Sequence, residues 1–267
     1  MAVSTSLRGR VPGQAVINNI VVAQDSVPPR SSAARFFGAS PLASSTRGLY
    51  RAALGELAVG QMLNQLGTQW DILHAVPVDE LSGQIDHLVI GPGGVFALFT
   101  ENYPGQEIRV VGDTMTIAGR VVDDIPAVRR LADSAADRLS EAAGRSIRVE
   151  PVIVVIDSTR LLLRDQPEGI FIVDSRHLLR LLTGVDRTLA GSEVAYISDV
   201  ADRPSTWQSN FTSPERALQL SRDFAALREQ VRSAAQLRVA WGLVGFVALC
   251  AIAWSVTVAL TEQLLHM

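Results

Sequence analysis

A run of 23 residues without a charged side chain, 239–261, most limits what the C-terminal part of this chain can fold into. Built as an α-helix rising about 1.5 Å per residue, the run extends roughly 34 Å, enough to cross a hydrocarbon core about 30 Å thick. Trp241 and Trp254 lie near its ends, where aromatic residues gather at membrane interfaces. A buried core helix is the alternative, but the length and the lack of charge favour a transmembrane helix.

Arginines gather on one side of this run. Arg228, Arg232 and Arg238 precede it, whereas the tail 262–267 contains no arginine. Because cytoplasmic flanks carry an excess of basic residues, we expect a single-pass protein of the cell membrane with its N-terminal body in the cytoplasm. The first 45 residues show no basic start followed by an apolar stretch of signal-peptide length, which agrees with this orientation. The same arginines could also bind anionic headgroups.

Hydrophobic periodicity divides the remaining chain into regular elements. We predict helices at 48–67, 125–144, 176–184 and 213–238, strands at 70–78, 151–157 and 169–175, two strands within 83–105 and a hairpin at 107–122. This order predicts an α/β fold with a mixed sheet flanked by helices. The predicted parts are a flexible lead 1–45, in which 16–22 could form an edge strand, an α/β domain 46–202, a juxtamembrane helix 203–238, the transmembrane helix 239–261 and a tail 262–267.

The net charge of −3 conceals an uneven distribution. The lead has four arginines and one aspartate (+3), the domain 46–202 has 14 arginines and 22 acidic residues (−8), and 203–238 has six arginines and three acidic residues (+3). All 24 basic residues are arginine, so chemistry that needs a lysine ammonium, such as Schiff-base formation or a Walker-type phosphate lysine, is excluded. An acidic domain also disfavours nucleic-acid binding, which depends on neutralising phosphates.

Three carboxylates are candidates for chemistry. Glu56 lies in the first predicted helix, Asp86 in or near a strand, and Glu101 after the next strand. Such residues could converge on one divalent cation, since Mg²⁺ binds through one or two carboxylates and several waters. The alternative is that Asp86 and His87 serve packing or turn hydrogen bonds and that Glu56 is a solvated helix residue.

The sequence around these acids indicates a family more specifically than the spacing of the acids does. LGE in the first helix is followed by GQIDHLVIGPGGVF and by a strand that ends in TENYPG. These words resemble the nuclease-related domain (NERD) family, which is similar to the PD-(D/E)XK nuclease superfamily. The resemblance covers residues 50–150 and is strongest over 83–105. It implies a restriction-endonuclease-like core.

The sequence departs from the superfamily pattern where the chemistry is concentrated. That pattern places an acid on the first helix, an aspartate on a strand and an acid-x-lysine pair on the next strand. Glu56 and Asp86 match the first two, but Phe99 and Glu101 occupy the pair. Phe99 offers no oxygen to a metal, and Glu101 has the opposite charge to a lysine that would stabilise the reacting phosphate. The resemblance therefore implies a degenerate site.

Two other sequence patterns are weaker candidates for a functional site. GPGG at 91–94 lies between strands and lacks the spacing and lysine of a phosphate-binding loop, so we predict a hairpin turn. His74, His87 and His177 lack the spacing of a zinc site.

We predict a membrane-anchored, cytoplasmic module with a degenerate site and no cofactor, which acts by binding an unknown protein partner or as a scaffold. Two alternatives stay open. One is a metal-dependent nuclease with a rearranged Glu56/Asp86/Glu101 site, in which Asp86 and Glu56 bind Mg²⁺ or Mn²⁺. The other is non-catalytic nucleic-acid binding at the membrane, which the acidic domain disfavours.

Overall fold

The structure, a computed structural model, describes residues 6–79, 83–207 and 214–265. The chain forms two compact units. The first, called the domain unit, comprises Met1–Ile20 and Gly48–Ser221, and the second, called the stalk unit, comprises Val21–Arg47 and Arg222–Met267. We describe each unit by itself.

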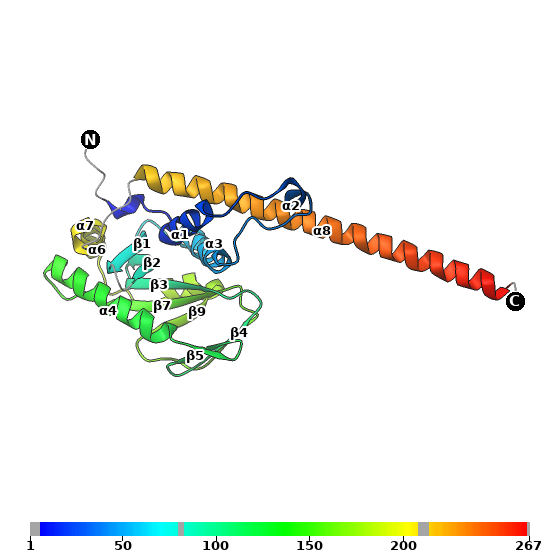
Figure 1. Ribbon diagram of the computed structural model, residues 1–267. Helices are drawn as coiled ribbons and strands as arrows, with labels where there is room; N and C mark the ends of the chain where they lie inside the picture. Colours follow the sequence, from blue (N-terminus) through cyan, green and yellow to red (C-terminus); the bar gives the residue numbers. More distant parts are fainter. Residues whose placement is uncertain (1–5, 80–82, 208–213, 266–267) are drawn as a thin grey trace. The chain divides into compact units, whose positions relative to one another are not determined.

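A five-stranded mixed sheet forms the centre of the domain unit (Figure 1). Its strands are β1 (Asp71–Asp79), β2 (Gly83–Gly91), β3 (Gly94–Asn102), β7 (Val149–Ile156) and β9 (Phe171–Asp174), in the order β1-β2-β3-β7-β9. The first three are antiparallel, whereas β3, β7 and β9 run parallel. The pairing of Gly91 with Gly94 confirms the predicted hairpin turn. Strands β7 and β9 thus belong to the same sheet as β2 and β3, the strands where the resemblance to the nuclease-related domain is strongest.

A second mixed sheet has the order β6-β5-β4-β8. Its strands are β4 (Glu107–Val111), β5 (Thr114–Ile117), β6 (Arg120–Val122) and β8 (Arg160–Asp165). The predicted hairpin 107–122 is therefore a three-stranded meander, and β8 pairs parallel with β4. Ala118 and Gly119 both have positive φ, at 48° and 80°, as a two-residue type I′ turn requires. The fold class is confirmed, with two mixed sheets in place of the single expected one.

Helices cover both faces of the five-stranded sheet (Figure 1). Apolar residues of α3 (Thr46–Leu63) and α5 (Leu178–Gly184) pack on one face, and those of α4 (Asp124–Ala143), α6 (Gly191–Asp202) and α7 (Pro204–Trp207) pack on the other. Close packing of α3 depends on Gly55, because a Cβ there would lie 3.0 Å from Asn102 Cβ. A Cβ at Gly60 would lie 2.5 Å from Pro12 Cγ. These contacts hold α3, and with it Glu56, close to β3.

The described part of the lead contains η1 (Leu7–Gly9), α1 (Gln14–Asp25) and α2 (Ser32–Phe36). The edge strand expected at 16–22 is wrong, because this stretch belongs to α1. Ile17 and Ile20 are buried and lie three residues apart, which matches one face of a helix. The boundaries of the parts predicted from the sequence stay predictions.

Helix α8 (Pro214–Leu265) runs for 52 residues. The predicted juxtamembrane helix therefore continues directly into the charge-free run. Within α8, Glu215–Thr257 contains an 18-residue window with a mean hydropathy of 2.1, none of which is buried. By length and composition α8 is a candidate membrane span.

Candidate carboxylate site

The fold brings the three predicted acids within electrostatic range of one another. Glu56 lies on α3, Asp86 on β2 and Glu101 on β3. The charge of Asp86 raises the pKa of both Glu56 and Glu101. Helix α3 packs on the sheet beside β3, so residues 45 positions apart in the sequence share one environment.

Asp86 is partly buried, and its carboxylate accepts a hydrogen bond from the Thr100 backbone N–H at 2.6 Å. Burial disfavours the charged form and raises the pKa of Asp86 to about 7, although the Thr100 bond acts in the opposite direction. A carboxyl with a pKa near neutrality and a fixed backbone contact is a strong functional candidate.

Glu56 is 3% exposed, so it is not the solvated helix residue of the alternative interpretation. Burial raises its pKa well above 4.5, and the neighbouring Asp86 adds to the increase. The Gly13 backbone N–H stabilises the carboxylate and lowers this pKa. Glu56 Oε2 is buried without a hydrogen-bond partner, an arrangement that is costly unless the group is protonated or binds a ligand.

Two residues that the sequence analysis missed extend the cluster beyond Glu101. Burial raises the pKa of Glu101 to about 8, and the charges of Asp124 and, more weakly, Asp86 contribute to the increase, while the Tyr103 hydroxyl opposes it. Asp124 is the first residue of α4, and its own pKa is raised by burial. Burial and the two carboxylates also raise the pKa of Tyr103. The acidic start of the predicted helix 125–144 was the available signal for Asp124.

A histidine pair also lies on β1 and β2. His74 and His87 face each other across the strands, with their Nδ1 atoms 2.9 Å apart. Burial lowers the pKa of His74 to about 4 and that of His87 well below 6.5. Both rings are therefore neutral near pH 7, and one Nδ1–H donates to the other Nδ1. A separation of 13 residues gave no reason to expect this contact from the sequence. The pairing of β1 with β2 brings the two rings together.

Backbone strain accompanies these groups. Ala75 has a φ of 50°, which is uncommon for a residue with a side chain, and it lies between the strand pairs His74–His87 and Val76–Ile85. The Arg10 guanidinium donates a hydrogen bond to the Ala75 carbonyl and holds this conformation. Such outliers gather at functional sites, where the surrounding structure imposes them.

No cation balances the carboxylates within the described part of the chain. None of Glu56, Asp86, Glu101 and Asp124 forms an ion pair there. Phe99, which the sequence analysis expected at the position of the superfamily acid, is 6% exposed and belongs to a core cluster that also contains apolar residues of α4. Among residues 6–79, 83–207 and 214–265, no three His, Cys, Asp or Glu side chains are placed to hold a metal ion together.

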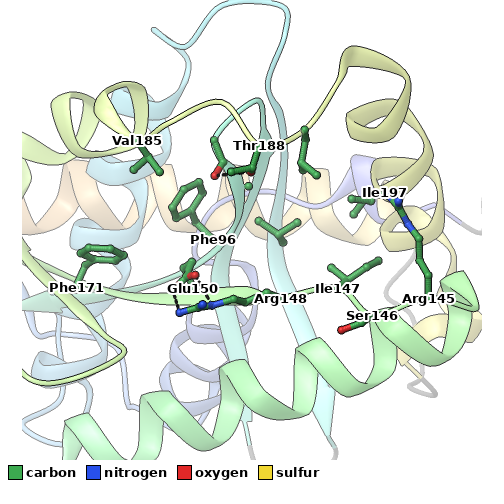
Figure 2. Close-up of a pocket in the computed structure, with 14 residues that line it drawn as sticks. Phe96, Arg145, Ser146, Ile147, Arg148, Glu150, Phe171, Val185, Thr188 and Ile197 are labelled. Atoms are coloured by element: carbon green, nitrogen blue, oxygen red, sulfur yellow. Dashed lines mark hydrogen bonds and ion pairs between the residues drawn. The ribbon is translucent and has the colours of Figure 1, made fainter.

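A pocket of about 410 Å³ lies at the other end of the same strands, beside the first residues of β3 and β7 (Figure 2). Phe96 and Phe171 give it an apolar wall. Its two arginines are already engaged, Arg148 with Glu150 at 2.6 Å and Arg145 with a carboxylate of α6 at 2.9 Å. The pocket is remote from the carboxylates and has no uncompensated charge to attract an anion, so the carboxylate cluster is the stronger candidate site.

Comparison with known families agrees with the resemblance found in the sequence. Residues 51–156 match the family described as nuclease-related domain, NERD. No curated protein and no solved structure shows significant similarity to the chain. The matched segment extends from α3 to the last residue of β7 and contains all four clustered carboxylates. Residues 51–156 are therefore similar to the nuclease-related domain, and a candidate membrane span follows in α8.

Proposed function

We propose that this protein is a membrane-anchored nuclease-related module that does not hydrolyse nucleic acid and acts in the cytoplasm by binding a protein partner. The observation that carries the proposal is the environment of Glu101. This residue occupies the lysine position of the superfamily pattern, and its neighbours are the acidic groups Asp124 and Asp86.

Electrostatics supports the absence of hydrolysis. Cleavage of a phosphodiester requires positive charge or fixed donors where negative charge develops in the transition state. A phosphodiester at this cluster would instead meet carboxyl groups, neutral or negative, whose pKa values are raised by burial and further by their acidic neighbours, and none of which supplies positive charge. With arginine as its only basic residue type, the chain has no lysine that could replace the missing one.

The charge distribution along the chain supports the membrane and cytoplasmic part of the proposal. Arg228, Arg232 and Arg238 precede the apolar run of α8, and no arginine follows it. This asymmetry supports a cytoplasmic position of the domain. The domain 46–202 carries a net charge of −8, from 14 arginines and 22 acidic residues, which favours a protein partner over nucleic acid.

A nuclease assay tests the proposal directly. The full chain in detergent micelles would be incubated with single- and double-stranded DNA and RNA in Mg²⁺ or Mn²⁺, alongside Asp86→Asn as the matched control. We expect no cleavage by either protein above a buffer blank. Metal-dependent cleavage by the natural chain that Asp86→Asn abolishes would overturn the proposal.

A rearranged metal-dependent nuclease is the second candidate, and the unpartnered Glu56 Oε2 beside Asp86 favours it. These two carboxylates with several waters would make a sufficient donor set for Mg²⁺ or Mn²⁺. A bound cation would lower the pKa of Asp86. Mn²⁺ titration followed by electron paramagnetic resonance separates the candidates, since binding that Asp86→Asn and Glu56→Gln both remove supports the metal site, and no binding supports the non-hydrolytic module.

A further inference from the structure

Within the stalk unit, the segment around α2 is fixed on α8 by specific contacts. Trp241 Nε1 donates to the Phe36 carbonyl at 2.8 Å, and Arg238 donates to the Gly38 carbonyl at 3.1 Å. Gly38 has a φ of 72°, and a Cβ there would lie 2.5 Å from the Ala234 carbonyl oxygen. The backbone of this segment therefore approaches α8 as closely as a glycine permits.

Three aromatic rings meet at this contact and leave much of their surface uncovered. The ring centroid of Trp241 lies 4.9 Å from that of Phe36 and 5.4 Å from that of Phe37. Phe36 and Phe37 are nevertheless 57% and 59% exposed. We call Phe36, Phe37 and Trp241 the aromatic foot. A cluster of large exposed rings on a monomer indicates an interaction surface.

The position of the foot along α8 indicates what covers it. Trp241 is the third residue of the charge-free run 239–261. If α8 crosses a bilayer, the foot lies at the level where the hydrocarbon begins, and aromatic side chains prefer this level. The exposed rings are thus continuous with the apolar surface of the candidate span.

Basic residues surround the foot without acidic partners. The segment 26–47 contains Arg30, Arg35 and Arg47 but no acidic residue. Arg30 and Arg35 line a pocket of about 430 Å³ beside Gln230 of α8. Arg30 donates to the Ala39 carbonyl and to Gln230, and Arg35 donates to the Arg30 carbonyl, so neither guanidinium forms an ion pair in the described part of the chain.

We propose that the segment 30–38 is a second membrane contact, in which the aromatic foot inserts at the interface and Arg30 and Arg35 bind anionic phospholipid headgroups. The inference rests on the membrane anchor of the proposed function and adds a lipid preference to it. The charges are complementary, since the basic segment faces a layer of phosphates. Phe side chains supply the apolar contact that buries the foot in the acyl boundary.

Depth measurements on the full chain in lipid nanodiscs test this contact. In a Cys250→Ser background, which leaves no other cysteine, a nitroxide would be attached to one introduced cysteine at a time. Phe37→Cys reports on the foot, Leu249→Cys on the span and Ala142→Cys, an exposed residue of α4, on water. Collisions with oxygen and with a water-soluble nickel complex measure the depth of each label.

We expect the Leu249→Cys label in hydrocarbon and the Phe37→Cys label protected from nickel in discs that contain phosphatidylglycerol. Arg30→Gln with Arg35→Gln should lower this protection, by about fivefold per arginine in the insertion equilibrium, since each arginine near an anionic surface contributes about that factor. Arg164→Gln with Arg180→Gln, two exposed arginines of the domain unit, is the matched control and should leave it unchanged.

The outcomes separate the two proposals. A Phe37→Cys label as open to nickel as the Ala142→Cys label, with the Leu249→Cys label in hydrocarbon, would overturn the foot alone. A Leu249→Cys label in water would overturn the anchor itself. Equal protection in phosphatidylcholine discs, or in the Arg30→Gln/Arg35→Gln chain, would overturn the headgroup preference.

Discussion

Glu56 in the domain unit is buried, whereas Trp254 in the stalk unit is exposed. Each side chain thus lies in the environment that its residue type usually avoids. The carboxylate of Glu56 is 3% exposed, whereas the indole of Trp254 is 74% exposed. Folded proteins usually place charge outside and large apolar groups inside. One unit thus holds charge inside, and the other holds apolar surface outside.

The two exceptions differ in what resolves them. The buried acids are accommodated within the fold, because their raised pKa values allow them to keep their protons. The exposed apolar face of α8 cannot be accommodated in this way, because side chains such as Phe246 and Trp254 have no group that titrates. It requires an external partner, for which a bilayer is the fitting solvent. The domain unit therefore accommodates its exceptional side chains internally, whereas the stalk unit depends on an external partner.

The largest expected effect concerns the external partner of α8. Val247→Arg with Leu249→Arg places two charges in the middle of the apolar run, at a cost of about 3 kcal/mol each in a bilayer. We expect most of the doubly substituted chain to leave the membrane fraction on alkaline carbonate extraction. Val247→Leu with Leu249→Val keeps the positions apolar and should stay in the pellet. If the arginine chain also stayed in the pellet, α8 would not be a membrane span.

A smaller effect is expected from replacing Phe99, a buried residue of β3. Phe99→Asp replaces a buried ring by a carboxylate and should lower the free energy of unfolding by about 4 kcal/mol, through the lost apolar burial and the buried charge. Phe99→Leu should cost only about 1 kcal/mol. Denaturant unfolding of both variants in detergent measures the difference. A Phe99→Asp chain of natural stability would mean that position 99 opens to solvent, as a superfamily acid would.

The smallest effect is a pH dependence of stability. Asp86 and Glu101 have folded pKa values of about 7 and 8, against ordinary values of 3.8 and 4.5. The folded state therefore binds more protons than the unfolded state above pH 4.5, and the free energy of unfolding falls as the pH rises. His74, with its pKa lowered to about 4, acts in the opposite direction between pH 4 and 6.5. The window from 6.5 to 8 isolates the carboxylates.

In that window we expect the free energy of unfolding to fall by about 1 to 2 kcal/mol, since one proton corresponds to about 1.4 kcal/mol per pH unit. Glu101→Gln keeps the shape of the side chain but does not titrate, so it should remove the Glu101 contribution and leave those of Asp86 and Glu56. Asp165→Gln, in the exposed strand β8, is a control that should not change the slope. A pH-independent stability of the natural chain would indicate that the acids are ionised and hydrated.

The predictability of the fold differs between its parts. The GPGG turn, the buried strand at β7 and the helix α4 followed by Gly144 were all anticipated, because local turn and periodicity signals agree with their tertiary environment. Strand β8 was missed because it lies at the edge of the second sheet, where none of its residues is fully buried and no alternation marks a strand. The segment 16–22 was misassigned because VINNIVV, a short mainly apolar segment, fits a strand and a helix equally well.

The sequence alone shows that this protein lacks every reaction that needs a lysine side chain. It also determined the apolar character of α8, because a lysine-free composition and a charge-free run are properties of the chain before it folds. Only the tertiary structure decided that Glu56 is buried beside Asp86, that Tyr103 and Asp124 extend the cluster, and that His74 contacts His87. These facts depend on strand register and on the close approach of α3 at Gly55, which join residues that no spacing in the sequence connects.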